Sequence, residues 1–234
     1  MASELLRIDN LNAWYGESHI LHGVDLTVNE GEVVCLLGRN GSGRTTTLRA
    51  IVGMTGARTG SIRIKGQEAI KLAPHKVARL GVGYCPEERG IFASLSAEEN
   101  LMLPPVIGAG GMSVTEVHDM FPNLKERASS PGTRLSGGEQ QMLAVARILR
   151  TGARLLLLDE ISEGLAPVIV QKLGEMIRTL KAKGYTIVLV EQNFRFAAPL
   201  ADRFYVMEHG KIVQQFAQSE LAARMDMLHE FLGI

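Results

Sequence analysis

Nine consecutive residues have the types and spacing that bind the phosphate chain of a nucleotide. They follow the apolar run 33–37, read Gly-Arg-Asn-Gly-Ser-Gly-Arg-Thr-Thr over positions 38–46, and fit the phosphate-loop pattern G-x-x-x-x-G-K-S/T except at position 44. The glycines at 38, 41 and 43 allow a tight backbone that turns successive N–H groups toward an anion. A glycine-rich turn without a ligand is the alternative. The predicted strand at 32–37 and helix at 45–52 favour the phosphate site.

The residue at position 44 decides how this loop can act. A cation there would reach the β- and γ-phosphates, and the hydroxyl of Thr45 would ligate Mg²⁺. Arg44 keeps the positive charge of the usual lysine but exchanges a compact ammonium for a longer planar fork. Phosphate neutralisation is therefore expected, and binding without hydrolysis stays open beside hydrolysis.

A second set of chemical groups ends the four-leucine run 155–158. Asp159 follows this predicted strand and would hold Mg²⁺, and Glu160 comes one residue later, where it could polarise an attacking water. Many buried strands end in solvated acids, so this pair alone is weak. Together with the loop at 38–46 it indicates a nucleotide hydrolase.

The stretch 133–141, Thr-Arg-Leu-Ser-Gly-Gly-Glu-Gln-Gln, is the third signal. Ser136 and the two glycines after it predict a second anion-binding nest, at the start of a helix over 140–149. Ser136 and Glu139 also form a capping box, which is a purely structural interpretation of the same residues. The two interpretations are compatible.

These three motifs, in this order and at these separations, resemble the ATP-binding-cassette (ABC) ATPases over nearly the whole chain. The resemblance implies a head-to-tail dimer with two ATP sites, in which the phosphate loop of one subunit faces Ser136 and Gly138 of the other. Tyr15 matches the aromatic position that stacks on adenine, although packing in the core would also explain it. Nucleotide contacts are thereby expected from Tyr15, Gly38, Arg39, Asn40, Gly41, Ser42, Gly43, Arg44, Thr45, Thr46, Glu87, Ser136 and Gly138.

The resemblance also implies a metal and a catalytic set. Thr45, Asp159 and Glu87 are expected to hold Mg²⁺, and Glu160, Arg44 and Gln192 to act in catalysis.

Finer features resemble one branch of the family, the ATPase subunits of importers for branched-chain and other hydrophobic amino acids. They are the stretches 84–89, 163–167 and 190–193. Most ABC ATPases have glutamine where this chain has Glu87 and histidine where it has Gln192. Gln192 can donate a hydrogen bond to a γ-phosphate but cannot carry a proton, so Glu160 is inferred to be the catalytic carboxylate.

The elements that must position these residues alternate between strands and helices. This alternation predicts an α/β fold with a mainly parallel sheet and helices on both faces. The expected organisation is one P-loop ABC cassette over 1–234. Residues 1–87 and 151–234 would form the nucleotide-binding core with an N-terminal antiparallel β subdomain, and 88–150 an inserted helical subdomain. Ser96 and Ser113 open capping boxes within it, and Ile91 with Phe92 is the expected contact for a membrane partner.

Composition limits the possible partners and the compartment. The 25 basic and 25 acidic residues give a net charge of zero, which excludes a global attraction to nucleic acid. Cys35 and Cys85 lie in apolar stretches and predict no disulfide, as in a reducing cytosol. The N-terminal stretch lacks a signal-peptide core, and no apolar run approaches the roughly 20 residues that cross a bilayer. A chain of this kind is expected in the cytoplasm, peripheral on the inner face of the cell membrane.

The predicted function is that of an ATP-hydrolysing subunit of an amino-acid importer. Its expected partners are a second ABC ATPase subunit, identical or paralogous, two transmembrane permease subunits and, indirectly, a periplasmic or extracellular substrate-binding protein. One alternative is an ATP-gated interaction subunit with little hydrolysis. Another is the ATPase of a transporter for urea, amide or lipid. A cassette of DNA repair or translation fits least, because paired cassettes and long coiled insertions are missing.

Overall fold

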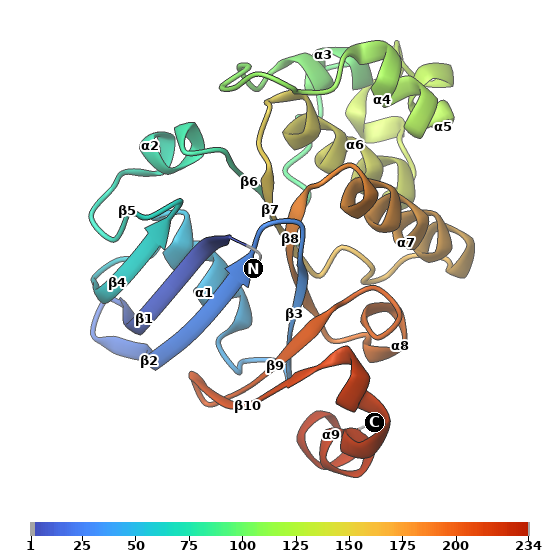
Figure 1. Cartoon of the computed structure of the whole chain (residues 1–234). Helices are drawn as coiled ribbons and strands as arrows, with labels where there is room; N and C mark the ends of the chain where they lie inside the picture. Colours follow the sequence, from blue (N-terminus) through green and yellow to red (C-terminus); the bar gives the residue numbers. More distant parts are fainter. Residues whose placement is uncertain (1–2, 234) are drawn as a thin grey trace.

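Two β-sheets organise residues 3–233, the part of the chain that this computed structural model describes (Figure 1). Met1 and Ala2, which belong to the N-terminal stretch considered above, and Ile234 lie outside the described residues. The larger sheet has the strand order β10-β9-β3-β8-β7-β6 and the smaller sheet the order β2-β1-β4-β5. The larger sheet consists of β3 (Val33–Gly38), β6 (Val82–Cys85), β7 (Leu155–Asp159), β8 (Thr186–Glu191), β9 (Arg203–Glu208) and β10 (Lys211–Ala217). The smaller sheet consists of β1 (Glu4–Tyr15), β2 (Ser18–Asn29), β4 (Arg58–Ile64) and β5 (Gln67–Glu68).

Parallel pairing in the larger sheet brings the predicted motifs to one edge. The pairs β3–β8, β7–β8, β6–β7 and β3–β9 are parallel, and only β10, which forms a hairpin with β9, is antiparallel. The predicted antiparallel N-terminal unit is also confirmed, because β1 pairs antiparallel with both β2 and β4. Since parallel strands end at the same edge, the loop after β3 and the acids at the end of β7 lie on either side of the end of β8.

The strands of the larger sheet are buried on both faces. In β3, Val33, Cys35 and Leu37 pack in one apolar cluster with residues of the long helices, while Val34 and Leu36 pack in a second cluster with the smaller sheet. A side-chain period of two produces this division. Both cysteines are buried and free, which confirms the prediction that they form no disulfide.

The helices lie around this sheet, with one group gathered at the top of Figure 1. That group contains α3 (Ala97–Met102), α4 (Val114–Met120), α5 (Pro122–Glu126) and α6 (Gly137–Arg150), preceded by the 3-10 turn η1 (Gly132–Arg134). The others are α1 (Arg44–Ile51), α2 (Pro74–Arg79), α7 (Pro167–Ala182), α8 (Phe194–Ala197), the 3-10 helix η2 (Gln218–Arg224) and α9 (Met225–Leu232). Among residues 3–233, no helix is both long and apolar enough to span a bilayer.

The capping boxes are confirmed, and one of them corrects a sequence expectation. Ser96, Ser113 and Ser136 each exchange two hydrogen bonds with the glutamate three residues later. With Ser136 as N-cap, α6 begins at Gly137 and not at 140, so both glycines lie in its first turn. Neither glycine has a positive φ. The predicted nest at 136–138 is therefore wrong, and this site offers the N–H groups of a helix N-terminus instead.

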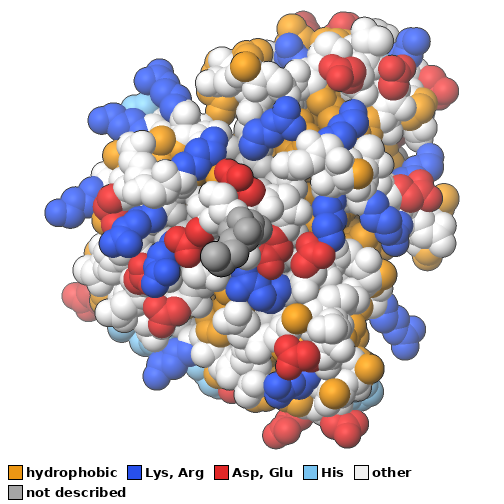
Figure 2. All heavy atoms as spheres, in the orientation of Figure 1, with side chains coloured by type: hydrophobic (Ala, Val, Ile, Leu, Met, Phe, Trp, Pro, Cys, Tyr) orange, Lys and Arg blue, Asp and Glu red, His pale blue; other side chains and the backbone are white. Residues whose placement is uncertain are grey.

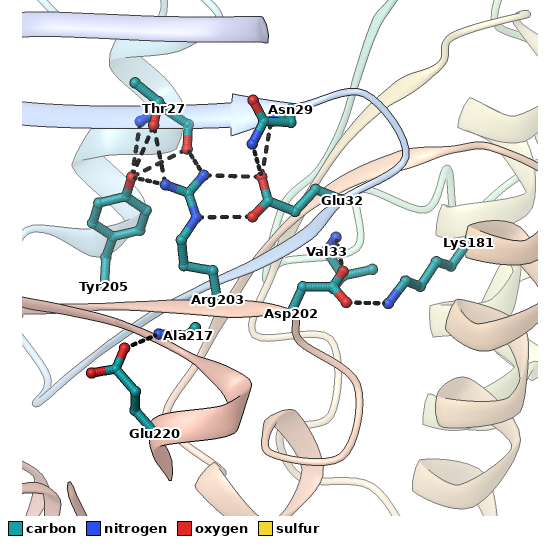
Figure 3. A network of polar contacts seen from close by, with 10 residues as sticks. All are labelled: Thr27, Asn29, Glu32, Val33, Lys181, Asp202, Arg203, Tyr205, Ala217 and Glu220. Atoms are coloured by element: carbon teal, nitrogen blue, oxygen red, sulfur yellow. Dashed lines mark hydrogen bonds and ion pairs between the residues drawn. The ribbon is translucent and has the colours of Figure 1, made fainter. Parts of the chain in front are cut away.

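A polar network joins the two sheets (Figure 3). The Arg203 guanidinium of β9 donates to both carboxylate oxygens of Glu32, at 2.8 and 2.9 Å, and to the Thr27 carbonyl of β2 at 2.6 Å. The Tyr205 hydroxyl also lies within hydrogen-bond distance of Thr27. The side chains of Arg203 and Glu32 are only 16% and 13% exposed. This network therefore fixes the smaller sheet to β9 of the larger one.

We expect Arg203→Ala to lower the free energy of unfolding by about 2 kcal/mol, because it leaves the mostly buried Glu32 carboxylate without its cationic partner and removes one donor from the Thr27 carbonyl. Urea denaturation measures this change. Arg7→Ala is the control, since Arg7 pairs with Asp9 on the surface and its loss should matter little. Equal effects of the two substitutions would contradict the proposed role of the network.

Candidate active site

The loop 38–46 is a tight connection between β3 and α1, as predicted. Gly43 caps α1 with a φ of 109°, which favours glycine, and its carbonyl accepts a hydrogen bond from the Thr47 hydroxyl at 3.0 Å. At Gly38 a Cβ would come within 2.5 Å of the Met207 carbonyl oxygen. Any side chain there would push the loop away from β9.

This loop borders a cavity of about 390 Å³. The cavity is lined by loop residues 40–46 together with Tyr15, Ile20, Glu87, Glu160 and Glu163. Tyr15 is 40% exposed, so the alternative that it packs in the core is wrong. Thus Tyr15, the loop and two of the predicted acids share one cavity, although they come from distant parts of the sequence.

Arg44 is buried at this cavity and pairs with Glu160. Its Nη2 donates to the Glu160 carboxylate at 2.7 Å and to the Asn40 side-chain oxygen at 3.2 Å. Arg44 is only 4% exposed, and within residues 3–233 its Nη1 finds no hydrogen-bond partner. The buried Ser42 hydroxyl is also unpaired within the same range. Two polar groups without partners in a phosphate-type loop fit an anionic ligand.

Glu160 has a strained backbone conformation and a carboxyl group whose pKa is raised. It follows β7 with a φ of 47°, a left-handed conformation that costs about 1 kcal/mol or more for a residue with a Cβ. Burial raises the pKa of the Glu160 carboxyl to about 7; a hydrogen bond with Glu163 adds to this rise, and the Arg44 charge opposes it. From the sequence, we expected Arg44 to bind phosphate and Glu160 to polarise the attacking water. In this structure the two groups bind each other.

Asp159 and Thr45 come together as predicted for a metal site. Asp159 is fully buried, and its Oδ1 accepts a hydrogen bond from the Thr45 hydroxyl at 3.1 Å. Burial raises the pKa of Asp159, while the hydroxyls of Tyr84 and Thr45 that bind it oppose the rise. A hydroxyl and a carboxylate oxygen are hard ligands of the kind that Mg²⁺ prefers. The residues present therefore fit that ion.

Two residues at the site were not assigned a role from the sequence. Tyr84 donates from its hydroxyl to Asp159 Oδ2 at 3.0 Å. Glu163 forms an acidic group with Glu87 and Glu160, in which one carboxylate oxygen of each lies within 4.8 Å of the others. In the sequence, Tyr84 stood out only as the first residue of the stretch 84–89, which resembles the importer branch. Its position follows from the parallel pairing of β6 with β7, which sets it opposite Leu157, two residues before Asp159.

Six predicted residues do not line the loop cavity: Gly38, Arg39, Asp159, Gln192, Ser136 and Gly138. Gln192 lines a neighbouring cavity of about 940 Å³ together with Glu160 and Glu163. Ser136 is exposed at the start of α6, and Gly138 is buried where a Cβ would come within 2.9 Å of Ile169. Neither Ser136 nor Gly138 lines the loop cavity of the same chain.

Comparison with known proteins identifies the family. The family model described as ABC transporter matches residues 21–163. The chain is 40% identical over 98% of its length to the high-affinity branched-chain amino acid transport ATP-binding protein BraG of Pseudomonas aeruginosa, all of which is covered. The chain belongs to the ABC transporter family. This cassette is also 32% identical to the lipopolysaccharide export system ATP-binding protein LptB of Escherichia coli K12, over 97% of each chain.

Solved structures confirm the fold of the cassette. A nucleotide-free ATP-binding cassette of an ABC transporter superposes with a TM-score of 0.85 at 22% identity, over 99% of both chains. A dimeric cassette in a post-hydrolysis state, bound to ADP and phosphate, has a TM-score of 0.80 at 24% identity and covers 92% of this chain and 99% of that one. At these identities the likeness concerns the fold. It confirms the predicted α/β ABC cassette with its antiparallel N-terminal sheet.

Proposed function

We propose that this cassette binds ATP with Mg²⁺, hydrolyses it, and thereby powers a transporter. The observation that carries the proposal is the convergence of Arg44, Thr45, Asp159 and Glu160 on the end of one parallel sheet. Tyr15 would stack on adenine, and loop residues Gly38 to Thr46 would cradle the phosphates. Mg²⁺, held by Thr45 and Asp159 with Glu87 nearby, would supply charge stabilisation at the β- and γ-phosphates.

In this mechanism, two anionic groups compete for Arg44: the Glu160 carboxylate and the γ-phosphate of ATP. Arg44 pairs with Glu160 in the structure, and a γ-phosphate would compete for the same guanidinium. Transfer of Arg44 to the phosphate would leave the Glu160 carboxylate available to orient and deprotonate the attacking water. Gln192, from the adjacent cavity, would add a neutral hydrogen-bond donor to the γ-phosphate.

The second half of the site is proposed to come from another subunit. Ser136 and Gly138 stand at the N-terminus of α6, outside the loop cavity of their own chain. The partial positive charge of a helix N-terminus suits the γ-phosphate held by a facing subunit. The related post-hydrolysis cassette is dimeric. We therefore propose a head-to-tail dimer, with an identical or paralogous partner, that encloses two ATP molecules.

The proposed cargo is a branched-chain or other hydrophobic amino acid, because the sequence identity to BraG exceeds that to LptB and because Gln192 replaces the usual histidine.

The cassette would act in the cytoplasm at the inner face of the membrane, on two permease subunits that receive their substrate from a binding protein outside. Phe92, which is 55% exposed beside the half-buried Ile91, is the proposed contact. Acidic and basic groups are intermixed on the face shown in Figure 2, which offers no stripe for nucleic acid.

Purification of this cassette from a detergent extract tests the transporter assignment. We expect two permease chains and a second cassette to co-purify, and reconstituted vesicles to take up leucine in an ATP-dependent manner. Recovery of lipid-export components would instead favour the LptB-like alternative.

We expect Glu160→Gln to reduce phosphate release about 100-fold or more while ATP binding persists, since the amide cannot accept the proton of the attacking water. Steady-state phosphate release and equilibrium ATP binding measure the two effects. Wild-type turnover in Glu160→Gln would contradict the hydrolysis mechanism.

Arg44→Lys extends the same experiment. It keeps the charge at position 44 and restores the usual residue, so it should bind ATP and turn over at least as fast as the wild type. Tight ATP binding by a wild type that releases no phosphate would support the ATP-gated alternative.

The proposed dimer predicts that Ser136→Asp abolishes ATP-dependent dimerisation. Aspartate is as good an N-cap as serine, so α6 should remain folded, but its charge would face the γ-phosphate of the partner site. Ser113→Asp is the matched control, because Ser113 caps α4 through the same pair of hydrogen bonds. Light scattering of the two variants in the Glu160→Gln background reads the outcome. Dimers that form equally in both variants would contradict the composite site.

A further inference from the structure

We propose that Tyr84 is a positioning residue for the metal site: its hydroxyl holds the Asp159 carboxylate in the orientation in which Asp159 and Thr45 bind Mg²⁺ with the nucleotide. The inference rests on the proposed function and adds a residue to its machinery. It starts from the direct hydrogen bond of 3.0 Å between the Tyr84 hydroxyl and Asp159 Oδ2.

The direction of this hydrogen bond follows from the two groups that form it. The Asp159 carboxylate offers only acceptor oxygens, and the Tyr84 hydroxyl carries a single proton. The single hydroxyl proton of Tyr84 is then committed to Asp159.

Two hydroxyls thereby hold the two oxygens of one carboxylate. Thr45 binds Oδ1 at 3.1 Å and Tyr84 binds Oδ2 at 3.0 Å. Rotation of the carboxylate about its Cβ–Cγ bond would break both contacts at once. Because Asp159 is fully buried, the lost contacts would be costly. The plane of the carboxylate is thus set before any ligand arrives.

Helix α1 links Thr45 to the chain segment that follows Tyr84. Thr45 and Arg49 are four residues apart on α1 and therefore share one face of it. Arg49 also donates to Glu88 at 2.8 Å, in the segment that follows β6. A displacement of α1 relative to β6 would therefore move Thr45 relative to Tyr84 and disturb the carboxylate that the two hydroxyls hold.

Tyr84→Phe tests the proposal, because it removes the hydroxyl and keeps the ring. The measurement is the dissociation constant of the non-hydrolysable ATP analogue AMP-PNP in excess Mg²⁺ and in EDTA. Loss of a group that orients a metal ligand typically weakens metal affinity about 10- to 100-fold. We expect the gain in affinity that Mg²⁺ gives to fall by about tenfold or more, while the affinity in EDTA is unchanged.

Tyr205→Phe is the matched control, because it also removes a hydrogen-bonded tyrosine hydroxyl, between β9 and Thr27 and away from the loop cavity. It should lower the melting temperature and leave the Mg²⁺ gain intact. A full Mg²⁺ gain in Tyr84→Phe, with only a lower melting temperature, would overturn the positioning role. A wild type that binds AMP-PNP equally with and without Mg²⁺ would contradict the proposed function itself.

Discussion

Parallel pairing of β3, β8 and β7 is the constraint on which the rest of the molecule depends. It places the end of each strand at one edge of the sheet, so that the loop after Gly38 meets the acids after Leu158 across β8. Every residue of these three strands is buried, which makes the pairing difficult to shift. A slip by one residue would turn Asp159 to the opposite face of the sheet.

Several ionisable side chains at this edge of the sheet are buried away from water. Arg44, Asp159 and Glu191 are each buried, and Glu160 is nearly so. Each finds a partner within the chain: Arg44 binds Glu160, Asp159 binds two hydroxyls, and Glu191 accepts from the backbone and side chain of Ser162. Because an unpaired buried charge is far costlier than a paired one, the site is held in a defined arrangement before a ligand binds.

The sequence could predict the parts of this site that local rules control. The loop 38–46, the capping box at Ser136 and the buried strand before Asp159 follow from spacing and hydrophobicity, and the structure confirms each of them. The start of α6 was misplaced because glycines discourage a helix by propensity, whereas the Ser136 cap enforces one there. Arg44 and Glu160 are 116 residues apart, and Tyr84 and Asp159 are 75 apart. No local pattern contains such contacts, since they arise from the order of the strands.

The contacts of Arg44 explain how an arginine fits at position 44 of the phosphate loop. Its Nη2 alone serves both Glu160 and Asn40, while Nη1 stays buried and unpaired among the described residues. One nitrogen of the planar fork therefore pairs with the Glu160 carboxylate, and the other is left unpaired at the loop cavity. The contact with Glu160 lowers the free-energy cost of burying both charges. An incoming phosphate would first bind the unpaired Nη1 and would then compete with Glu160 for Nη2. Arginine thus keeps a positive charge where most phosphate loops have lysine, and it adds a direct contact between the loop and the acid that follows β7.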